Sequence, residues 1–473
     1  MTQKSPSIFW FRRDLRLADN PALDAARQRG GPIILLYIDE VNRGRDLGGA
    51  SKVWLHHSLA ALETDISAKG GTLIMRRGKA AEILREIIKD TDADAVFWNR
   101  RYELWARDID SQIKSDLTDD GITVESFNGN LLSEPWMVET KSGGDYYKVF
   151  TPYWRAAKDS FHVPDLAPTP RKLDCVSGIQ SDDLDDWNLL PKRPDWGSKL
   201  LDHHSPGEAG ASERLSSFLD GPVEDYADAR DRPDDETGTS KLSPHLAHGE
   251  ISPRQIWHAT KDNYYSSDKL LNEIGWREFS YVLLFHNPKL ASENYKSDFD
   301  NFEWDPDEAK IDAWRHGQTG YPFVDAGMRQ LWQTGWQHNR VRMVCASFLI
   351  KHLLTDWRIG EAWYWDTLLE ADPASNAASW QWVAGSGADA SPYFRIFNPF
   401  SQGQKFDPNG DYVRKYVPEL KDMPRKHIHT PWDAPKDVLD KAGVKLGDTY
   451  PKPIVDHKPA RETALAAYKA SRA

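Results

Sequence analysis

Short apolar runs alternate with amphipathic helical patterns over residues 1–130. Ser7–Phe11 and residues 32–38 have the length and composition of buried strands. Asn20-Pro21 opens a helix that runs to Arg29, with proline in the first turn, where its missing N–H costs no hydrogen bond. The same periodicities predict helices over 51–68, 79–88 and 103–117, and strands over 72–75, 95–98 and 122–127. Strands and helices alternating at this spacing predict right-handed βαβ units around a parallel sheet.

The pattern changes twice after this region. Residues 131–205 contain recurrent prolines and begin an acidic stretch, which indicates a long interdomain linker. From residue 206 helical periodicity dominates, as in the apolar stripe of Val341, Val344, Cys345, Phe348 and Leu349. We therefore predict an α/β fold class: a Rossmann-like parallel-sheet domain over 1–130, the linker over 131–205 and an all-helical domain over 206–473. No GxGxxG follows the first strand, so an ordinary dinucleotide site there is not expected.

The charge of the chain is unevenly distributed. The 473 residues have a formal net charge of -12, which at first argues against a nucleic-acid partner. Residues 181–235 hold fifteen acidic side chains against six Lys and Arg, a net of -9. Residues 321–355 hold four Lys and Arg against one acid, a net of +3. A basic DNA-binding surface is therefore compatible with the acidic total.

Two cysteines, Cys175 and Cys345, are too few for a disulfide framework or a thiolate metal site. The apolar run before Arg12 is too short for a signal peptide, and no stretch approaches ~20 apolar residues. These observations lead us to expect a cytoplasmic protein without a membrane partner. His203, His204, His245 and His248 lack a carboxylate or cysteine at ligand spacing, so no metal site is expected.

A polar and aromatic block in the helical region carries the candidate chemistry. Thr239, Ser240 and Ser243 surround Lys241 in a short loop that could bind a pyrophosphate, although Ser243-Pro244 is also an ordinary helix start. Arg340 and Arg342 lie in a largely apolar helix and need a carboxylate, a phosphate or an aromatic face; Glu370 and Asp372 are the candidates for Arg342. The aromatic side chains beside polar residues could pack in a core or stack on a base or a flavin; they are Trp276, Trp380 and Trp382.

Taken together, these segments resemble the photolyase/cryptochrome family over nearly the whole chain. The matching motifs are WFRRDLRLADNPAL (10–23), KVFTPYWRA (148–156), TSKLSPHLAHGEISPRQIW (239–257), WREF (276–279), QTGYPFVDAGMRQL (318–331), GWQHNRVRM (335–343) and WQWVAGSGADASPYFRIFNPFSQGQKFD (380–407). The resemblance implies an N-terminal α/β antenna domain and a C-terminal helical domain that holds FAD in a U shape. This agrees with the division made from periodicity alone.

The resemblance also assigns cofactor residues. Contacts to the FAD phosphates and ribitol fall on Tyr226, Thr239, Ser240, Lys241, Leu242, Ser243 and Arg277. Asn339 and Arg342 match residues near the flavin ring, and Arg342 is expected to pair with a carboxylate. Asp372 would accept a hydrogen bond from flavin N3–H, and Asn376 would face flavin N5, where plant-type cryptochromes have aspartate. The active cofactor implied is the reduced form, FADH⁻.

Substrate contacts are implied in the same way. Glu273 resembles the carboxylate that binds the damaged base pair, and Trp276 and Trp382 resemble the aromatics that sandwich a flipped-out dimer. Met343 would lie beside the dimer, and Arg230 and Arg340 would contact backbone phosphates. Members that repair (6-4) lesions have a histidine pair where this chain has Asn339-Arg340, so cyclobutane pyrimidine dimers are the expected substrate.

Three tryptophans match the family's electron-transfer chain: Trp380 next to the flavin, Trp357 in the middle and Trp304 at the surface. Two departures are visible. Glu370 stands where an aspartate is common, and Trp105-Ala106 replaces the Asn-Glu of many folate-binding members. The antenna chromophore could therefore be methenyltetrahydrofolate, bound by other residues, or 8-hydroxy-5-deazaflavin.

The function implied is a deoxyribodipyrimidine photolyase, a lyase acting as a monomer on dimer-containing DNA. Excited FADH⁻ would donate an electron to the flipped-out dimer, which splits before the electron returns. The alternative is a cryptochrome-type blue-light receptor with little or no repair activity; another is repair restricted to single strands. Asn376, Glu273, Trp276, Trp382 and Met343 all favour repair. Damage-specific, salt-sensitive DNA binding is expected.

Overall fold

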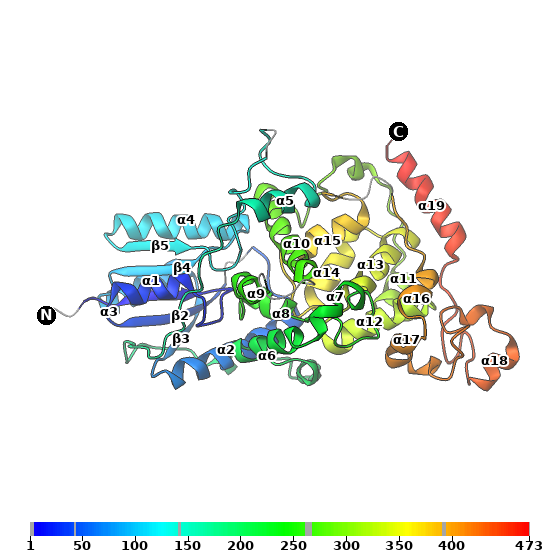
Figure 1. The fold of residues 1–473 in the computed structure, drawn as a ribbon, viewed down its shortest axis with the longest axis horizontal. Helices are drawn as coiled ribbons and strands as arrows, with labels where there is room; N and C mark the ends of the chain where they lie inside the picture. The colour runs from blue at the N-terminus through cyan, green and yellow to red at the C-terminus, as the bar shows by residue number, and fades with distance from the viewer. Residues whose placement is uncertain (1–3, 42–43, 141–142, 261–266, 390–393, 473) are drawn as a thin grey trace. The chain divides into compact units, whose positions relative to one another are not determined.

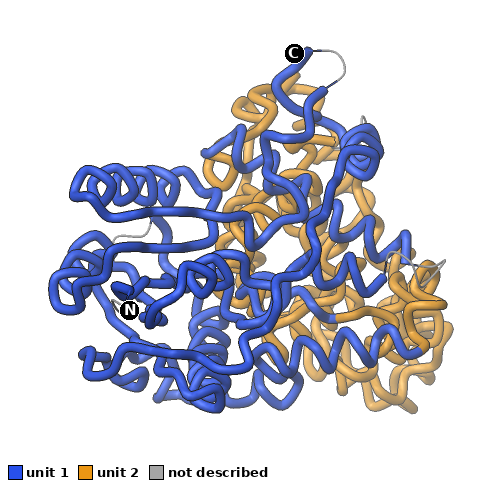
Figure 2. Tube along the Cα trace, turned by 60° about the vertical axis from the view of Figure 1, so that its left-hand side comes forward, with its two compact units in different colours: residues 1–220, 241–288 blue, residues 221–240, 289–473 orange. Residues whose placement is uncertain are grey.

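The computed structural model describes residues 4–41, 44–140, 143–260, 267–389 and 394–472 (Figure 1). Two compact units divide the chain (Figure 2): unit 1 is residues 1–220 and 241–288, and unit 2 is residues 221–240 and 289–473. This division differs from the three segments expected from the sequence. Unit 1 takes in residues 241–288, which were expected in the helical domain, because side chains such as Ser252 and Arg254 are bound to the N-terminal part of the chain.

Unit 1 is built on a five-stranded parallel sheet with strand order β3-β2-β1-β4-β5 (Figure 1). The strands are β1 (Ser7–Phe11), β2 (Ile33–Glu40), β3 (Leu73–Gly78), β4 (Ala95–Asn99) and β5 (Thr123–Phe127). The central strand β1 pairs Phe9 with Leu35 of β2 and with Phe97 of β4. The expected βαβ units and their parallel sheet are therefore present.

Helices cover both faces of this sheet, which explains its continuous apolar strands. Phe9 and Leu35 point to the face covered by α1 and α2, whereas Trp10 and Leu36 point to the face covered by α3 and α4. The helices of unit 1 are α1 (Pro21–Arg29), α2 (Gly49–Ala68), α3 (Ala80–Thr91), α4 (Leu104–Asp119), α5 (Phe150–Ser160), α6 (Glu208–Leu219), α8 (Ser243–His248), α9 (Pro253–Thr260) and α10 (Ser267–His286).

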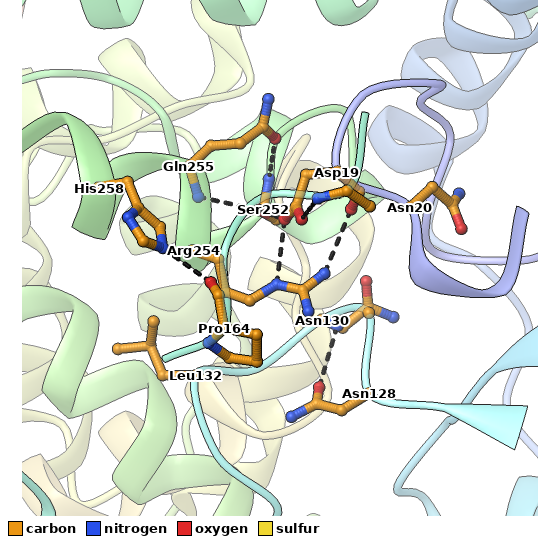
Figure 3. Close-up of polar contacts among 12 residues, drawn as sticks. Asp19, Asn20, Asn128, Asn130, Leu132, Pro164, Ser252, Arg254, Gln255 and His258 are labelled. Carbon is orange, nitrogen blue, oxygen red and sulfur yellow. Dashed lines mark hydrogen bonds and ion pairs between the residues drawn. The ribbon is translucent and has the colours of Figure 1, made fainter. Parts of the chain in front are cut away.

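A buried carboxylate explains why the later helices belong to unit 1 (Figure 3). Asp19, in the loop after β1, accepts hydrogen bonds from Ser252 Oγ at 2.5 Å and Arg254 Nε at 3.0 Å. Its other oxygen accepts the backbone N–H of Ala167 at 3.1 Å. Asp19 adopts φ 46°, a left-handed conformation that aspartate tolerates better than most residues. One side chain thus joins three distant segments.

A second buried hydrogen-bond network also joins residues near 250 to the N-terminal part of unit 1. Glu250 accepts hydrogen bonds from Trp54 Nε1 at 3.0 Å and from the backbone N–H of Gly207 at 2.8 Å, and it binds His245 Nδ1 at 2.5 Å. His245 is fully buried and packs its ring against Trp54. Among the described residues, no group of three or more His, Cys, Asp or Glu side chains is placed to hold a metal ion.

Unit 2 is helical around one large apolar core. Its helices are α7 (Tyr226–Ala229), α11 (Glu308–Arg315), α12 (Pro322–Thr334), α13 (Asn339–Ser347), α14 (Trp357–Thr367), α15 (Ser375–Ala384), α16 (Pro399–Phe406), α17 (Asp411–Tyr416), α18 (Lys436–Lys441) and α19 (His457–Ala470), with a π-helical turn at Phe348–His352. The stripe predicted from Val341 to Leu349 is buried in this core. No helix in the described part of the chain is long and apolar enough to cross a bilayer.

Candidate active site

The loop at 235–243 is shaped by its own hydrogen bonds. Asp235 accepts the backbone N–H groups of Thr237 and Gly238 at 2.9 and 3.0 Å. Gly238 packs so closely on α7 that a Cβ would lie 2.7 Å from the carbonyl oxygen of Ala229. The Oγ1 atom of Thr239 is buried without a hydrogen-bond partner among the described residues. A buried hydroxyl without a partner is costly, so this orphaned group fits a polar ligand such as a phosphate.

The chain after Thr239 also has features suited to an anion. Lys241 adopts φ 50°, which turns the backbone sharply, and Ser243 begins α8 with Pro244 in its first turn. Leu242 is buried, whereas Ser240, Lys241 and Ser243 keep partial exposure. Ser243 therefore starts a helix, as one of the two interpretations predicts, and it keeps partial exposure at the end of the loop.

In unit 2, α13 carries an arginine held by a carboxylate. Arg342 donates from Nε to the carbonyl of Gln337 at 2.6 Å, and its guanidinium forms an ion pair with Glu370. Of the two carboxylates considered from the sequence, Glu370 is the partner. The second oxygen of Glu370 is buried and has no hydrogen-bond partner among the described residues. Asn339 is exposed at the first position of the same helix.

Asp372 organises the start of α15. Its Oδ1 accepts the N–H groups of Ala374 at 3.0 Å and Ser375 at 2.7 Å, and its carbonyl accepts the N–H of Asn376. These bonds satisfy donors that a helix N-terminus leaves without intrahelical partners. Asp372 is only 7% exposed. The backbone that carries Asn376 is therefore fixed by Asp372.

The side chain of Asn376 is also fixed. Its Nδ2 donates to Glu361 Oε1 at 2.8 Å and to the carbonyl of Glu361 at 3.2 Å. An amide has two donors on nitrogen and an acceptor oxygen. With the nitrogen bound to Glu361, Oδ1 is the atom that can accept a hydrogen bond from a ligand. Glu361 was missed from the sequence, because no local motif links residues fifteen positions apart.

The tryptophans expected to carry electrons share one core. Trp380 and Trp357 are buried in it, and Trp304 packs against it with partial exposure. Trp380 lies edge-to-face with Tyr364 at 5.0 Å between ring centroids, and its six-membered ring fills the space where a side chain at Gly360 would lie. Trp357 donates Nε1–H to Asn294 at 2.9 Å. The requirement for glycine at 360 was not visible in the sequence.

The expected substrate residues of unit 2 lie on α7, α13 and α15 or directly follow them. Arg340 is paired with Asp231 at 2.7 Å, and its guanidinium lies 4.5 Å from the ring centroid of Phe406. Arg230, just after α7, lies 5.5 Å from the ring of Tyr226. Met343 and Trp382 are partly exposed and pack against the core. The partner Asp231 was not anticipated from the sequence.

The other expected residues of unit 1 lie on α10. Glu273 and Trp276 are partly exposed. Arg277 instead donates to the carbonyl of Asn130 at 2.7 Å and lies 3.6 Å from Glu278. The bond to Asn130 holds α10 to the segment after β5, so Arg277 has a structural role within unit 1.

The carboxyl ends of the strands of unit 1 carry buried charges. Arg12, after β1, pairs with Asp110 at 3.0 Å, and Arg101, after β4, pairs with Asp110 at 2.6 Å and with Glu40. The guanidinium of Arg101 lies 5.1 Å from the ring of Trp105. In doubly wound sheets, ligands bind at the carboxyl edge where the strand order reverses, which here lies between β1 and β4.

Comparison with known proteins identifies the family. Residues 7–172 match the model of DNA photolyase, and residues 270–470 match the FAD binding domain of DNA photolyase. The chain is 56% identical over 474 residues to the deoxyribodipyrimidine photo-lyase of Agrobacterium fabrum, covering 98% of each chain. This chain belongs to the photolyase/cryptochrome family.

A solved photolyase structure and a plant cryptochrome are also similar to this chain. A bacterial class III photolyase from Agrobacterium tumefaciens superposes with a TM-score of 0.97 at 55% identity, covering 100% of this chain and 98% of that chain. Cryptochrome-1 of Arabidopsis thaliana is 40% identical over 468 residues, covering 95% of this chain and 68% of the relative. The full-length identity supports photolyase function, a lyase activity with an FAD-binding domain, and the plant cryptochrome is more distant.

Proposed function

We propose that the protein repairs cyclobutane pyrimidine dimers in DNA with blue or near-ultraviolet light. The observation that carries this proposal is the 56% identity to a deoxyribodipyrimidine photo-lyase over 98% of both chains. When bound, reduced FAD would supply the excited electron that opens the two bonds joining the pyrimidines and would take it back afterwards. No general base or nucleophile is needed, because the cofactor would supply the chemistry.

The proposed cofactor contacts follow the chemistry of each group. Thr239, Ser240, Lys241 and Ser243 are proposed for the phosphates, and the orphaned hydroxyl of Thr239 supports this assignment. Tyr226, Leu242 and Arg277 are proposed from family resemblance alone, and the bonds of Arg277 within unit 1 weaken its case. Arg342 and Asn339 are proposed near the ring, with Glu370 fixing Arg342.

Two side chains are proposed to act at the flavin ring through hydrogen bonds. Asp372 would accept from N3–H, and Asn376 would present its carbonyl oxygen to N5. A carbonyl accepts a hydrogen bond and cannot donate one, so it favours a protonated N5, as in the reduced and the semiquinone flavin, over the oxidised cofactor. Glu361 supports this role because it occupies the amide nitrogen of Asn376.

For the substrate, a flipped-out dimer would be bound by Glu273, Trp276, Trp382 and Met343, with Arg230 and Arg340 at backbone phosphates. Stacking on tryptophan is worth about 1–3 kcal/mol per base, comparable to the cost of unstacking a damaged step. Trp380, Trp357 and Trp304 are proposed to photoreduce oxidised FAD and take no part in repair itself.

A second chromophore is proposed for unit 1 at the carboxyl edge of its sheet, either methenyltetrahydrofolate or 8-hydroxy-5-deazaflavin. Trp105 provides a flat aromatic face there, and Arg12 and Arg101 are held at this edge by Asp110 and Glu40, which balance their charges. The absorption spectrum of the purified protein, before and after denaturation, would distinguish a folate-type from a deazaflavin-type band. We further propose that the enzyme acts as a monomer in the cytoplasm.

The deciding experiment is illumination of the reduced protein with an oligonucleotide that contains one thymine dimer. Light-dependent recovery of the two thymines is expected, and no recovery would overturn the proposal. A cryptochrome-type receptor would photoreduce its flavin without repairing the dimer. Comparison of duplex and single-stranded substrates would separate general repair from repair restricted to single strands.

A further inference from the structure

One face of Trp276 is covered by an aromatic side chain from another helix. The rings of Trp276 on α10 and Phe150 on α5 are stacked, with centroids 3.8 Å apart and planes inclined by 10°. Phe150 is 9% exposed, whereas Trp276 keeps partial exposure. Both residues belong to unit 1, so this contact lies inside one compact unit.

A third aromatic ring, that of Phe279, lies next to the stacked rings of Trp276 and Phe150. Phe279 lies edge-to-face with Trp276 at 6.0 Å and with Phe150 at 6.1 Å. A ring on the opposite face of Trp276 would be much farther from Phe150 than from Trp276. The two nearly equal distances therefore place Phe279 beside the stacked pair. Phe279 therefore does not cover the face of Trp276 that is opposite Phe150.

The helix that carries Phe150 is itself fixed against α10. Phe150, Tyr153, Trp154 and Ala157 are the buried residues of α5, at helical spacing. The indole of Trp154 lies so close to α10 that a Cβ at Gly275 would be 2.6 Å from it. Tyr153 also contacts Phe279, at 5.2 Å. Glycine directly before Trp276 thus allows the close approach of α5.

We propose that Phe150 is a positioning residue that holds the Trp276 ring in the orientation needed to stack on the flipped-out dimer. This inference rests on the proposed function, in which Trp276 contacts the dimer. An indole on a helix surface can occupy several rotamers, and binding must otherwise select one of them. A parallel aromatic ring on one face removes that freedom and leaves a face for a base.

The variants are chosen to separate an effect on the orientation of Trp276 from an effect on folding of the protein. Phe150→Leu keeps an apolar side chain but removes the stack, and Phe150→Tyr keeps the ring. Phe161→Leu is the matched control, because Phe161 lies at the end of α5 and contacts Trp154 and Trp257. Thermal unfolding of each variant reports whether the protein remains folded.

The experiment measures affinity for a dimer-containing oligonucleotide and, separately, repair per absorbed photon at saturating substrate. For Phe150→Leu we expect affinity to fall about threefold to tenfold, the range of one aromatic pair. Repair at saturation should stay unchanged, because the bound geometry can still be reached. Phe150→Tyr should restore affinity, and Phe161→Leu should keep it.

The Trp276→Ala background tests whether Phe150 acts through Trp276. If it does, adding Phe150→Leu to Trp276→Ala causes no further loss of affinity. An equal additional loss in both backgrounds, or unchanged affinity in Phe150→Leu alone, would overturn the inference. If Trp276→Ala itself left affinity unchanged, the substrate role of Trp276 in the proposed function would fail instead.

Discussion

The amide nitrogen of Asn376 donates to Glu361 Oε1 at 2.8 Å, and this bond selects which end of the amide faces away from α14. Both side chains are buried, at 8% and 3% exposure. A flipped amide would bring two oxygens together, which costs free energy in a buried site. Glu361 therefore fixes the orientation of Asn376.

Glu361→Leu should weaken retention of the reduced flavin. Without the carboxylate, Asn376 loses its side-chain partner, and only the carbonyl of residue 361 still holds the amide nitrogen. A loss of about 1 kcal/mol corresponds to about fivefold faster reoxidation in air. Glu361→Gln keeps an acceptor oxygen and should reoxidise near the wild-type rate. Equal rates in all three proteins would show that the bond has no such role.

Trp357→Phe should separate photoreduction from repair. Trp357 is fully buried and donates to Asn294, so the change removes the indole and one hydrogen bond and costs about 1–3 kcal/mol of stability. We expect photoreduction of oxidised flavin to be abolished while chemically reduced protein still repairs dimers. Trp332→Phe is the control, since Trp332 is 60% exposed. Normal photoreduction in Trp357→Phe would contradict the proposed electron route.

The Arg340–Asp231 ion pair should limit affinity for DNA. Asp231 neutralises a guanidinium that is proposed to contact a phosphate, so Asp231→Asn should strengthen binding and steepen its salt dependence. A change of about one in the slope of log K against log salt is expected. Arg340→Ala should weaken binding to damaged and undamaged DNA alike. Titrations at several salt concentrations measure both effects, and an unchanged slope in Asp231→Asn would argue against a phosphate contact.

Glu278 should make stability depend on pH. Burial raises the pKa of Glu278 from 4.5 to about 7, although the nearby Arg277 and the backbone N–H groups of Ser133 and Leu132 oppose this. Between these values the folded protein keeps a proton that the unfolded chain has released. The contribution of Glu278 to the free energy of unfolding therefore falls as pH rises from 4.5 to about 7 and does not change above that range.

The substitution Glu278→Gln removes the pH-dependent contribution of this carboxyl group to the free energy of unfolding. Relative to the variant, the wild type should lose about 1–3 kcal/mol between about pH 4.5 and pH 7. Denaturant unfolding at several pH values measures the difference, and pH-independent costs of the substitution cancel in the comparison. Glu125→Gln, at an exposed position of β5, should follow the wild type. Parallel curves for wild type and Glu278→Gln would contradict the shift.

Local patterns predicted the architecture well because apolar periodicity reflects burial directly. The strands from β1 to β5 and the helices between them occupy the expected places, and the stripe on α13 and the π-helical turn after it is buried. The helix α5 was missed, since residues 131–205 were interpreted as a linker. Its four buried side chains do have helical spacing, but Pro152 and the neighbouring prolines obscured the pattern.

The site was predicted only as far as each residue carries its chemistry locally. Arg342 needed a carboxylate, and Glu370 was one of two candidates. The bonds of Asn376 to Glu361 and of Arg340 to Asp231 join segments that are distant in sequence, and periodicity contains no information about such pairs. The compact units also depend on long-range contacts, as at Asp19, and these could not be anticipated.

The bonds of Asp19 and Glu250 have a consequence for synthesis of the chain. The strands are complete at Phe127, yet Ser252, Arg254 and Glu250 supply partners for Asp19 and Trp54 from more than a hundred residues later. The sheet can form on the ribosome as soon as β5 emerges, but the Asp19 carboxylate and the Trp54 indole gain Ser252, Arg254 and Glu250 as partners only when residues 250–254 follow. Unit 1 can therefore complete its buried hydrogen bonds only after residues 250–254, beyond the middle of the chain, have been synthesised.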